Sequence, residues 1–251
     1  SPTELFLYAE RLGIFFERSN SEITHFSESG YLKVETDNVV AFLDVGVVGP
    51  NYLPGHAHAD TLSFELSLFG QRVFINSGTS EYDNSELRKF ERSTAAHNTV
   101  VVDDEDSSEV WSSFRVARRA YPHDFEIKKY AYGTNISCAH DGYNRLVGKP
   151  THRRHWKFSE CNLVVEDKIE GSFDTAFAYF HLHPSITVSN VGPFEWILCL
   201  PEGKLVTINA EADSAEWISS YYAFEFGKRI STQSLKLKLA ISGCRINIDW
   251  S

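Results

Sequence analysis

Alternation of apolar and polar residues at a period of two is the feature that most restricts the fold of this chain. It is clearest over residues 61–69, where every second residue (Leu62, Phe64, Leu66 and Leu68) is apolar and the residues between them are polar. Successive side chains of a strand point to opposite faces, so this pattern predicts a strand with one buried face. Gly70 and Gln71 then turn the chain into residues 72–75, which predicts a hairpin.

Short segments of the same kind recur along most of the chain, separated by turn signals such as Gly171-Ser172. Further strands are expected at 31–36, 39–46, 98–103, 113–119, 124–131, 151–158, 161–169, 174–183, 194–200, 204–210 and 234–249. Only residues 1–18 differ, because Ser1 to Glu4 fit a capping box and Leu5, Ala9, Leu12 and Phe16 follow at helical spacing. The expected fold is mainly β, an antiparallel β-sandwich with a short N-terminal helix, forming one domain over residues 1–251.

The charge balance excludes some classes of partner. Lys and Arg number 24 against 34 Asp and Glu, a net charge of −10, which argues against binding nucleic acid through a broad basic face. A polyanionic ligand would need local basic clusters, and these occur at 88–92, 115–119 and 152–157. The sequence contains no run of about 20 apolar residues, so we expect no membrane-spanning helix. The four cysteines lie far apart without a CxxC pair, which predicts no zinc finger and favours buried free thiols, with disulfides as the alternative.

Polar side chains gather at the ends of three expected strands. His56 and His58 precede the strand at 61–69, and two residues apart in extended backbone they share one face. Asn76 ends the hairpin partner of that strand, and His97 leads into the strand at 98–103. Imidazole nitrogens suit zinc and similar ions, and an amide oxygen can complete the set, so a metal site is one interpretation.

Two other patterns in the sequence also involve histidine. A second HxH, His181 to His183, lies inside an apolar strand without an obvious third ligand, and we interpret it as structural. Cupin barrels also use HxH, followed four or five residues later by Glu. Here Glu65 lies seven residues after His58, so the spacing argues against a cupin-like metalloenzyme.

Three blocks of this sequence resemble, in the correct order, the signatures of heparinase II/III-like polysaccharide lyases. HAHADTLSFEL at 56–66 resembles the family's HGHADALSFEL, and FINSGT at 74–79 looks like its (I/V)DPGT segment. RSTAAHNTVVVD at 92–103 is similar to the family's RSTAAHNTVVVDG. With weaker echoes further on, the resemblance runs from about residue 30 to about residue 185.

The resemblance implies the C-terminal β-sandwich of a bacterial lyase whose N-terminal (α/α) toroid is missing here, the helix at 1–18 being a lead-in from it. Family members cleave uronic-acid polysaccharides, heparan-type or alginate-type, by β-elimination, commonly in or beyond the periplasm. The family's metal ligands correspond to His58, Asn76 and His97. We therefore expect a structural divalent metal, zinc, although Asn76 stands where the family has Asp and an amide is the poorer ligand.

The same resemblance places His56 at the substrate cleft as the catalytic residue of this domain. Tyr82, Arg88 and Arg92, between the second and third blocks, are candidates to hold a substrate carboxylate or sulfate. The family's proton-transferring Tyr and His belong to the toroid, so this fragment is expected to be inactive alone. The alternative is a non-catalytic carbohydrate-binding or scaffolding β-domain.

Overall fold

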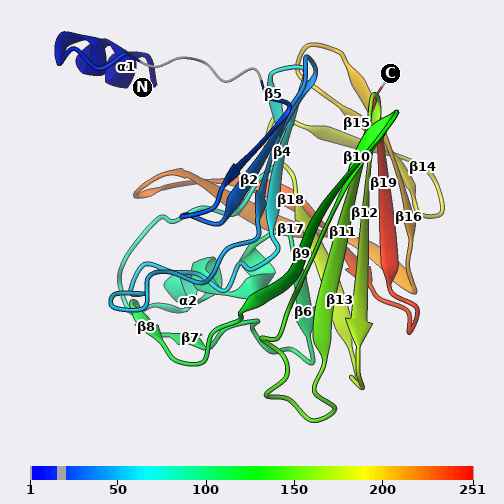
Figure 1. Cartoon of the computed structure of the whole chain (residues 1–251). Coiled ribbons are helices and arrows are strands. Elements are labelled where there is room, and N and C mark those ends of the chain that lie inside the picture. Colours follow the sequence, from blue (N-terminus) through cyan, green and yellow to red (C-terminus); the bar gives the residue numbers. More distant parts are fainter. Residues whose placement is uncertain (1, 16–20, 251) are drawn as a thin grey trace.

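The computed structural model describes residues 2–15 and 21–250, and three larger antiparallel sheets make up most of it (Figure 1). The first sheet, in the order β1-β2-β3-β4-β5, consists of β1 (Ile23–Phe26), β2 (Tyr31–Glu35), β3 (Val39–Asp44), β4 (Phe64–Leu68) and β5 (Gln71–Phe74). The second sheet has the order β14-β15-β16-β19-β12-β11-β10-β9. Its strands are β9 (Pro122–Tyr130), β10 (Gly133–His140), β11 (Thr151–Ser159), β12 (Asn162–Glu170), β14 (Thr187–Gly192), β15 (Glu195–Cys199), β16 (Leu205–Glu211) and β19 (Cys244–Trp250).

The third sheet has the order β17-β18-β13-β6, and a small hairpin and three helical segments complete the described structure. This sheet contains β6 (Val100–Val102), β13 (Ala176–His181), β17 (Ser214–Glu225) and β18 (Lys228–Lys238). The hairpin pairs β7 (Val110–Trp111) with β8 (Arg115–Val116), and the helical segments are α1 (Pro2–Arg11), α2 (Glu86–Arg92) and the 3-10 turn η1 (Thr94–Ala96).

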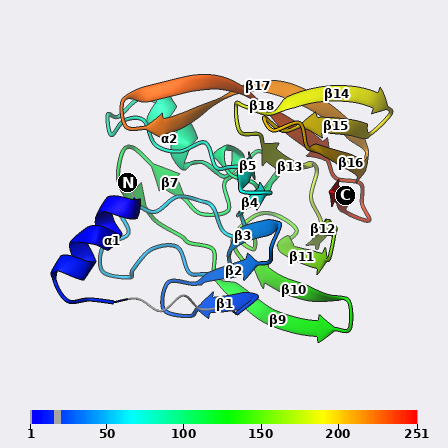
Figure 2. The same ribbon diagram turned by 90° about the horizontal axis from the view of Figure 1, so that it is seen from above.

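The three sheets share one core. The first and third sheets meet at an isolated antiparallel bridge between Phe74 and Leu182, so together they form a layer opposite the eight-stranded sheet. Seen from above, the eight-stranded sheet follows one side of the molecule from β9 round to β14 (Figure 2). Phe64, Phe74 and Phe180 pack ring against ring, and they belong to the same buried cluster as Trp156 of β11. Burial of apolar side chains such as these is the dominant favourable term in folding. The packed antiparallel sheets confirm the expected mainly β sandwich.

Several expected boundaries were wrong, and local backbone conformation explains two of them. The strand expected at 234–249 is two strands, β18 and β19, because the chain turns between them at Gly243, whose φ is +108°. The strand expected from residue 61 begins at Phe64, since Leu62 has a φ of +63° in a turn. Within 113–119 only β8 is extended. The expected helix at 1–18 is α1 over Pro2–Arg11, while residues 1 and 16–18 lie outside the described residues.

Strands β1, β7, β10, β14 and β17 and the helical segments α2 and η1 were not expected from the sequence. The four cysteines are free thiols, and Cys138 and Cys244 are buried, in agreement with the expectation. Among the described helices none combines the length and apolar character that crossing a membrane requires.

Candidate functional site

The candidate site lies where β4, β5 and β6 meet the loops that carry the sequence motifs. His58 lies in the loop before β4, Asn76 follows the end of β5, and His97 follows η1 just before β6. Backbone hydrogen bonds tie these segments together: the Ala59 N–H donates to Arg92 O at 2.9 Å, and the Ser77 N–H donates to Ala96 O at 3.1 Å. Segments that are far apart in sequence are thereby fixed at one end of the first and third sheets.

His58 and His97 lie side by side, as the motifs suggested. Nδ1 of His58 is 3.2 Å from Nε2 of His97. Burial, followed by the charges of Arg88 and Arg92, lowers the pKa of His58 to about 3. Burial, followed by the neighbouring His58 and His181, holds the pKa of His97 well below its usual value. Both imidazoles are therefore neutral at physiological pH, so each ring has one donor and one acceptor nitrogen.

Asn76 takes a different partner from the one expected. Its Nδ2 donates to Glu65 Oε1 at 3.3 Å, and its Oδ1 accepts the Asn98 N–H at 3.5 Å. Across residues 2–15 and 21–250 no three His, Cys, Asp or Glu side chains are grouped closely enough to hold a metal ion. Of the three expected ligands, His58 and His97 contact each other, and the Asn76 amide is held by Glu65 and Asn98.

The segment after Asn76 requires a glycine. Gly78 has a φ of +79°, and a Cβ there would lie 2.3 Å from the carbonyl oxygen of Ala223 in β17. Ala223 in turn donates its N–H to Ser77 O at 2.7 Å. A side chain at position 78 would therefore push β17 away from the site-bearing segment.

Beside Asn76 lies a cavity of about 360 Å³, whose walls include Phe26, Tyr31 and Phe42 and whose polar side chains include Asp44 and Glu65. Burial, followed by the charge of Asp60, raises the pKa of Asp44 well above its usual value. Burial likewise raises the pKa of Asp60 to about 6. These two carboxyl groups therefore resist ionising together.

Arg88 is 1% exposed and lies beneath the site, so its guanidinium serves mainly protein groups. Its Nη1 lies 3.4 Å from His58 Nε2 and 3.3 Å from Thr79 Oγ1. Glu91, also fully buried, pairs with Arg88 at 3.9 Å and accepts the Ser80 N–H at 2.9 Å. Ser85 caps the helix that carries both residues, accepting the Arg88 N–H at 3.0 Å.

The sequence suggested that Arg92 binds substrate, but the structure places it inside the protein with no exposed surface. Its guanidinium donates to the carbonyl oxygens of Ala57, Ser112 and Arg115 at 3.0 to 3.2 Å, and to that of Trp111 at 3.3 Å. Arg92 therefore joins the His56–His58 loop to the β7–β8 hairpin.

His56 is exposed and sits among aromatic rings. Its ring centroid is 5.4 Å from that of Tyr82 and 5.3 Å from that of Phe114, both edge to face. Tyr82 also packs 5.0 Å from Phe226, in the turn between β17 and β18, and Arg88 lies 5.2 Å from the Tyr82 ring centre. We call His56, Tyr82, Phe114 and Phe226 the ring cluster. Its three aromatic residues are 43–59% exposed, so they offer apolar ring faces to a ligand.

The sequence reasoning missed Phe114 and Phe226. Each lies in a turn, where the sequence has no periodicity. Phe226 is also far from Tyr82 in sequence, because three of the four strands of the third sheet come between them. The one available signal was the accumulation of aromatic residues at 221–226.

A buried charge network from the eight-stranded sheet supports the site from below. Arg154 of β11 donates to both carboxylate oxygens of Asp167 at 2.7 and 2.8 Å. It also donates to Leu62 O at 2.9 Å and to Asn98 O, and these residues follow His58 and His97 in the chain. Burial alone would raise the pKa of Asp167, but Arg154 and His152 together hold it well below its usual value. Arg154 thus links the two histidine-bearing segments to an ionised buried carboxylate.

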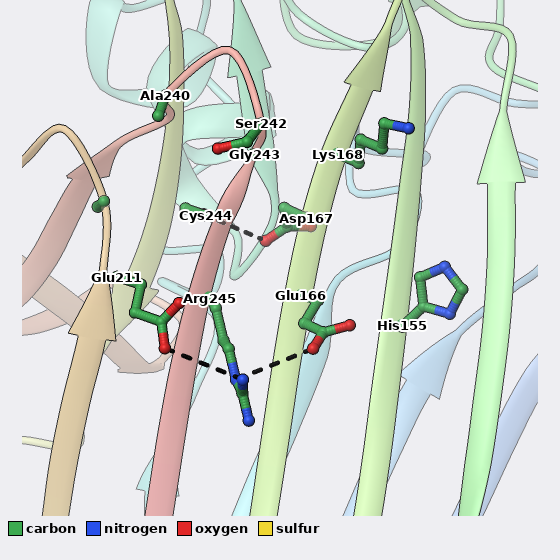
Figure 3. A pocket seen from close by; sticks show the side chains of 11 residues that line it. His155, Glu166, Asp167, Lys168, Glu211, Ala240, Ser242, Gly243, Cys244 and Arg245 are labelled. Carbon is green, nitrogen blue, oxygen red and sulfur yellow. Dashed lines mark hydrogen bonds and ion pairs between the residues drawn. The ribbon is translucent and has the colours of Figure 1, made fainter.

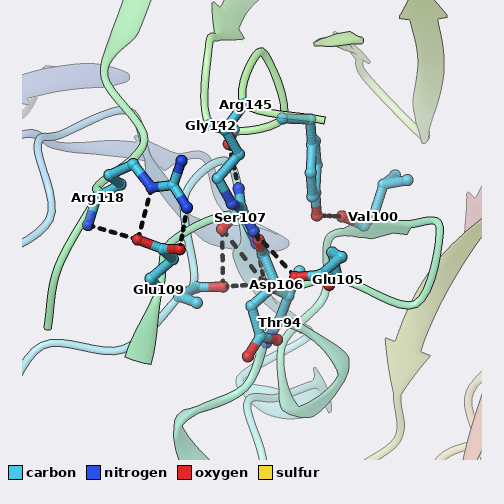
Figure 4. Close-up of polar contacts among 11 residues, drawn as sticks. Thr94, Val100, Glu105, Asp106, Ser107, Glu109, Arg118, Gly142 and Arg145 are labelled. Carbon is cyan, nitrogen blue, oxygen red and sulfur yellow. Dashed lines mark hydrogen bonds and ion pairs between the residues drawn. The ribbon is translucent and has the colours of Figure 1, made fainter. Parts of the chain in front are cut away.

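A second set of hydrogen bonds holds η1 in place (Figure 4). Asp106 Oδ1 accepts the Thr94 N–H at 2.7 Å, and Thr94 Oγ1 accepts the Ser107 N–H at 2.8 Å. Arg145 donates to the carbonyl oxygens of Asp106 and Gly142. The backbone that leads into His97 is therefore fixed from both sides.

A hollow on the eight-stranded sheet, of about 480 Å³, is lined by residues of β12, β16 and β19 (Figure 3). Its charged groups pair with each other, Arg245 lying 3.8 Å from Glu166 and 3.9 Å from Glu211. Its lining includes Asp167 of the buried charge network but none of His56, His58, Asn76 and His97, so we assign it no part in the site.

The residues of the second HxH and of the cupin-like spacing contact other protein side chains. His181 is buried, and its Nδ1 lies 2.6 Å from Ser234 Oγ, which agrees with a structural second HxH. Glu65 pairs with Arg72 and Asn76, so it is not the cupin-type partner of His58.

Comparison with known proteins gives a consistent family assignment. The family model described as "Heparinase II/III-like, C-terminal" matches residues 18–251. No curated protein matches the chain by sequence. Among solved structures, a heparinase III (the BT4657 gene product) is 16% identical, with a TM-score of 0.77 over 97% of this chain and 38% of its own length. A heparan sulfate lyase from Pedobacter heparinus is also 16% identical, with a TM-score of 0.74 over 97% of this chain and 38% of its own.

A third structure, a 4-alpha-glucanotransferase from Thermococcus litoralis, is 11% identical, with a TM-score of 0.51 over 94% of this chain and 41% of its own. At these identities the likenesses show the fold alone, and the chain spans about two fifths of the length of the structures it matches. With the family model matching nearly the whole length, this chain belongs to the heparinase II/III-like C-terminal family.

Proposed function

We propose that this chain is the sheet domain of a polysaccharide lyase that cleaves uronic-acid-containing glycans by β-elimination. The observation that carries the proposal is the exposed His56 imidazole, framed by Tyr82 and Phe114 and set two residues from the half-buried His58, which contacts His97. Family membership supplies the reaction class, and the ring cluster supplies a surface suited to a sugar.

The chemistry requires charge stabilisation and proton transfer. Removal of the C5 proton of a uronate places negative charge on its carboxyl group, and prearranged donors must stabilise that charge. A base must reach C5, and an acid must protonate the departing O4. His56 suits charge neutralisation or proton shuttling, because its exposed imidazole offers ring nitrogens that can donate or accept a hydrogen bond.

The other residues of the site position the substrate and His56. The Tyr82 ring and the neighbouring Phe114 and Phe226 pack against the apolar face of a sugar ring. Arg88 lies against the Tyr82 ring with its guanidinium buried, so in this proposal it supports Tyr82 without direct substrate contact. Arg92 holds the His56 loop through the Ala57 carbonyl and has no direct substrate contact in this proposal.

The remaining catalytic groups belong to a partner domain. Since the chain spans 38% of the heparinase III and heparan sulfate lyase structures, we assign the base and the other half of the cleft to an N-terminal (α/α) toroid of the same protein. We place the whole protein in the periplasm or outside the cell, where polymeric glycans are met. A heparan-type glycan is the first substrate class to test, and alginate is the second.

A non-catalytic carbohydrate-binding domain is the second candidate, and the exposed rings of Tyr82, Phe114 and Phe226 favour it equally. The two functions differ in the product formed. β-Elimination leaves an unsaturated uronate that absorbs in the ultraviolet, whereas binding leaves the polymer intact.

The experiment incubates the full-length protein, and separately this chain alone, with heparan sulfate, hyaluronan and alginate, and follows ultraviolet absorbance. We expect product from the full-length protein with at least one polymer, and none from the chain alone. No product from the full-length protein, combined with retention on a glycan column, would support the binding function instead. Rapid turnover by the chain alone would contradict the assignment of the base to the toroid.

A further inference from the structure

Three side chains from separate elements form a continuous hydrogen-bonded series at the heart of the site. Nη1 of Arg88, in α2, is 3.4 Å from Nε2 of His58. Nδ1 of His58 is in turn 3.2 Å from Nε2 of His97. Arg88 and His97 are 1% and 3% exposed. Which atoms carry the protons in this series decides what can hold the two imidazoles together.

The separation of the two imidazoles does not by itself show whether a metal ion or a direct hydrogen bond holds them together. Two nitrogen ligands at about 2.0–2.1 Å from a tetrahedral zinc ion lie about 3.3 Å apart, close to the 3.2 Å seen here. The same distance also suits an N–H···N hydrogen bond. The decision therefore rests on what faces Nε2, the outer nitrogen of the His58 ring.

A histidine that binds a metal donates its other ring N–H to a carboxylate, a carbonyl or water. Here the group facing Nε2 of His58 is the Arg88 guanidinium, which has five donors and no acceptor. Nε2 must therefore accept, and the His58 proton resides on Nδ1, directed at His97 Nε2. The lone pair that a metal would need on Nδ1 is thereby occupied.

The third position of the expected ligand set points to the same result. The Asn76 amide is engaged by Glu65 and by the Asn98 N–H, and an uncharged amide balances an ion's charge poorly. Two buried guanidinium groups, those of Arg88 and Arg92, already supply positive charge next to His58. A divalent cation would add to that charge, and the buried carboxylate of Glu91 already pairs with Arg88.

We propose that in this chain the Arg88 guanidinium, and not a metal ion, fixes the His58–His97 pair. Arg88 donates to His58, His58 donates to His97, and the pair holds the two site-bearing segments together. This inference goes beyond the proposed function and does not depend on it, because a lyase and a binding domain would use the same clamp.

The first test measures metal content and imidazole tautomers in the purified protein that contains this chain. After zinc is supplied and excess is removed by dialysis, elemental analysis should find far less than one equivalent of transition metal per chain. Long-range ¹H–¹⁵N spectra should show His58 as the Nδ1–H tautomer. About one equivalent of bound zinc, or an Nε2–H tautomer at His58, would overturn the proposal.

The second test restores a metal site. Asn76→Asp supplies the missing carboxylate, and adding Arg88→Gln replaces the guanidinium by a side chain whose oxygen can accept from His58 Nε2. The double variant should bind about one equivalent of zinc, Asn76→Asp alone should bind less, and His97→Ala in the double background should abolish binding. Zinc binding by the unaltered protein as tight as that of the double variant would contradict the proposal. If the variants fail to fold, the tautomer of His58 in the unaltered protein still decides the question.

Discussion

Replacement of Arg154 by Met tests how the eight-stranded sheet supports the site. The guanidinium is fully buried, pairs with Asp167 through two hydrogen bonds, and donates to the carbonyl oxygens of Leu62 and Asn98. Removing one partner of a buried ion pair typically costs about 3–5 kcal/mol, because the remaining charge is left uncompensated. The two carbonyls add to this cost, although such terms do not sum fully.

We therefore expect Arg154→Met to lower the free energy of unfolding by about 4 kcal/mol, a large part of the about 5–15 kcal/mol typical of a domain. Arg153→Met is the matched control, since the neighbouring Arg153 pairs at the surface with Asp124 and Glu170. Exposed pairs contribute about 0–1 kcal/mol. Urea unfolding, followed by tryptophan fluorescence, measures both variants. A loss for Arg154→Met within about 1 kcal/mol of the control would refute the reasoning.

Three further predictions address single features of the site. Gly78→Ala should destabilise the protein by about 2–4 kcal/mol in urea unfolding, because the new Cβ meets Ala223 O. Gly70 has a similar φ but open space around it, so Gly70→Ala should cost only about 1 kcal/mol. Equal losses for the two variants would contradict this explanation. The raised pKa of Asp60 means that the folded state holds an extra proton between about pH 4 and 6, so its carboxyl lowers stability as pH rises through that window. Asp60→Asn should therefore raise the melting temperature above pH 6 but not below pH 4, and a uniform shift at all pH values would argue against the assignment. Phe226→Ala should weaken the protein's affinity for the glycan by about tenfold, because one ring contact of about 1.4 kcal/mol is lost. Isothermal titration measures this affinity, and an unchanged value would show that Phe226 takes no part in glycan binding.

The strand-end convergence of His58 and His97 was accessible from sequence because period-two alternation locates β4 and the motifs flank it. The mainly β class followed from the same alternation repeated along the chain. Helix α2 was missed, although Ser85 before Glu86 carries an N-cap signal, because the helix is only two turns long. Short helices give too little periodicity to stand out.

Other parts of the site were beyond sequence reasoning because they depend on tertiary neighbours. Arg88 and Arg92 looked like surface cations that could face a substrate, yet both are buried, and only the fold supplies the carbonyls and carboxylate that permit it. Asn76 looked like a ligand by position, and its partner Glu65 became visible only when β4 and β5 paired. Phe226 reaches the ring cluster through the β17–β18 turn, which no local pattern indicates.

The central claim, that this site performs β-elimination through His56, is tested most directly by measuring kcat/KM for His56→Ala in the full-length protein. His183→Ala is the matched control, because His183 belongs to the second HxH and contacts Ser185 and Tyr222 instead of the ring cluster. We predict that kcat/KM falls about 10²–10⁴-fold for His56→Ala with the fold retained, and stays within about twofold for the control. Unchanged lyase activity in His56→Ala would contradict the account.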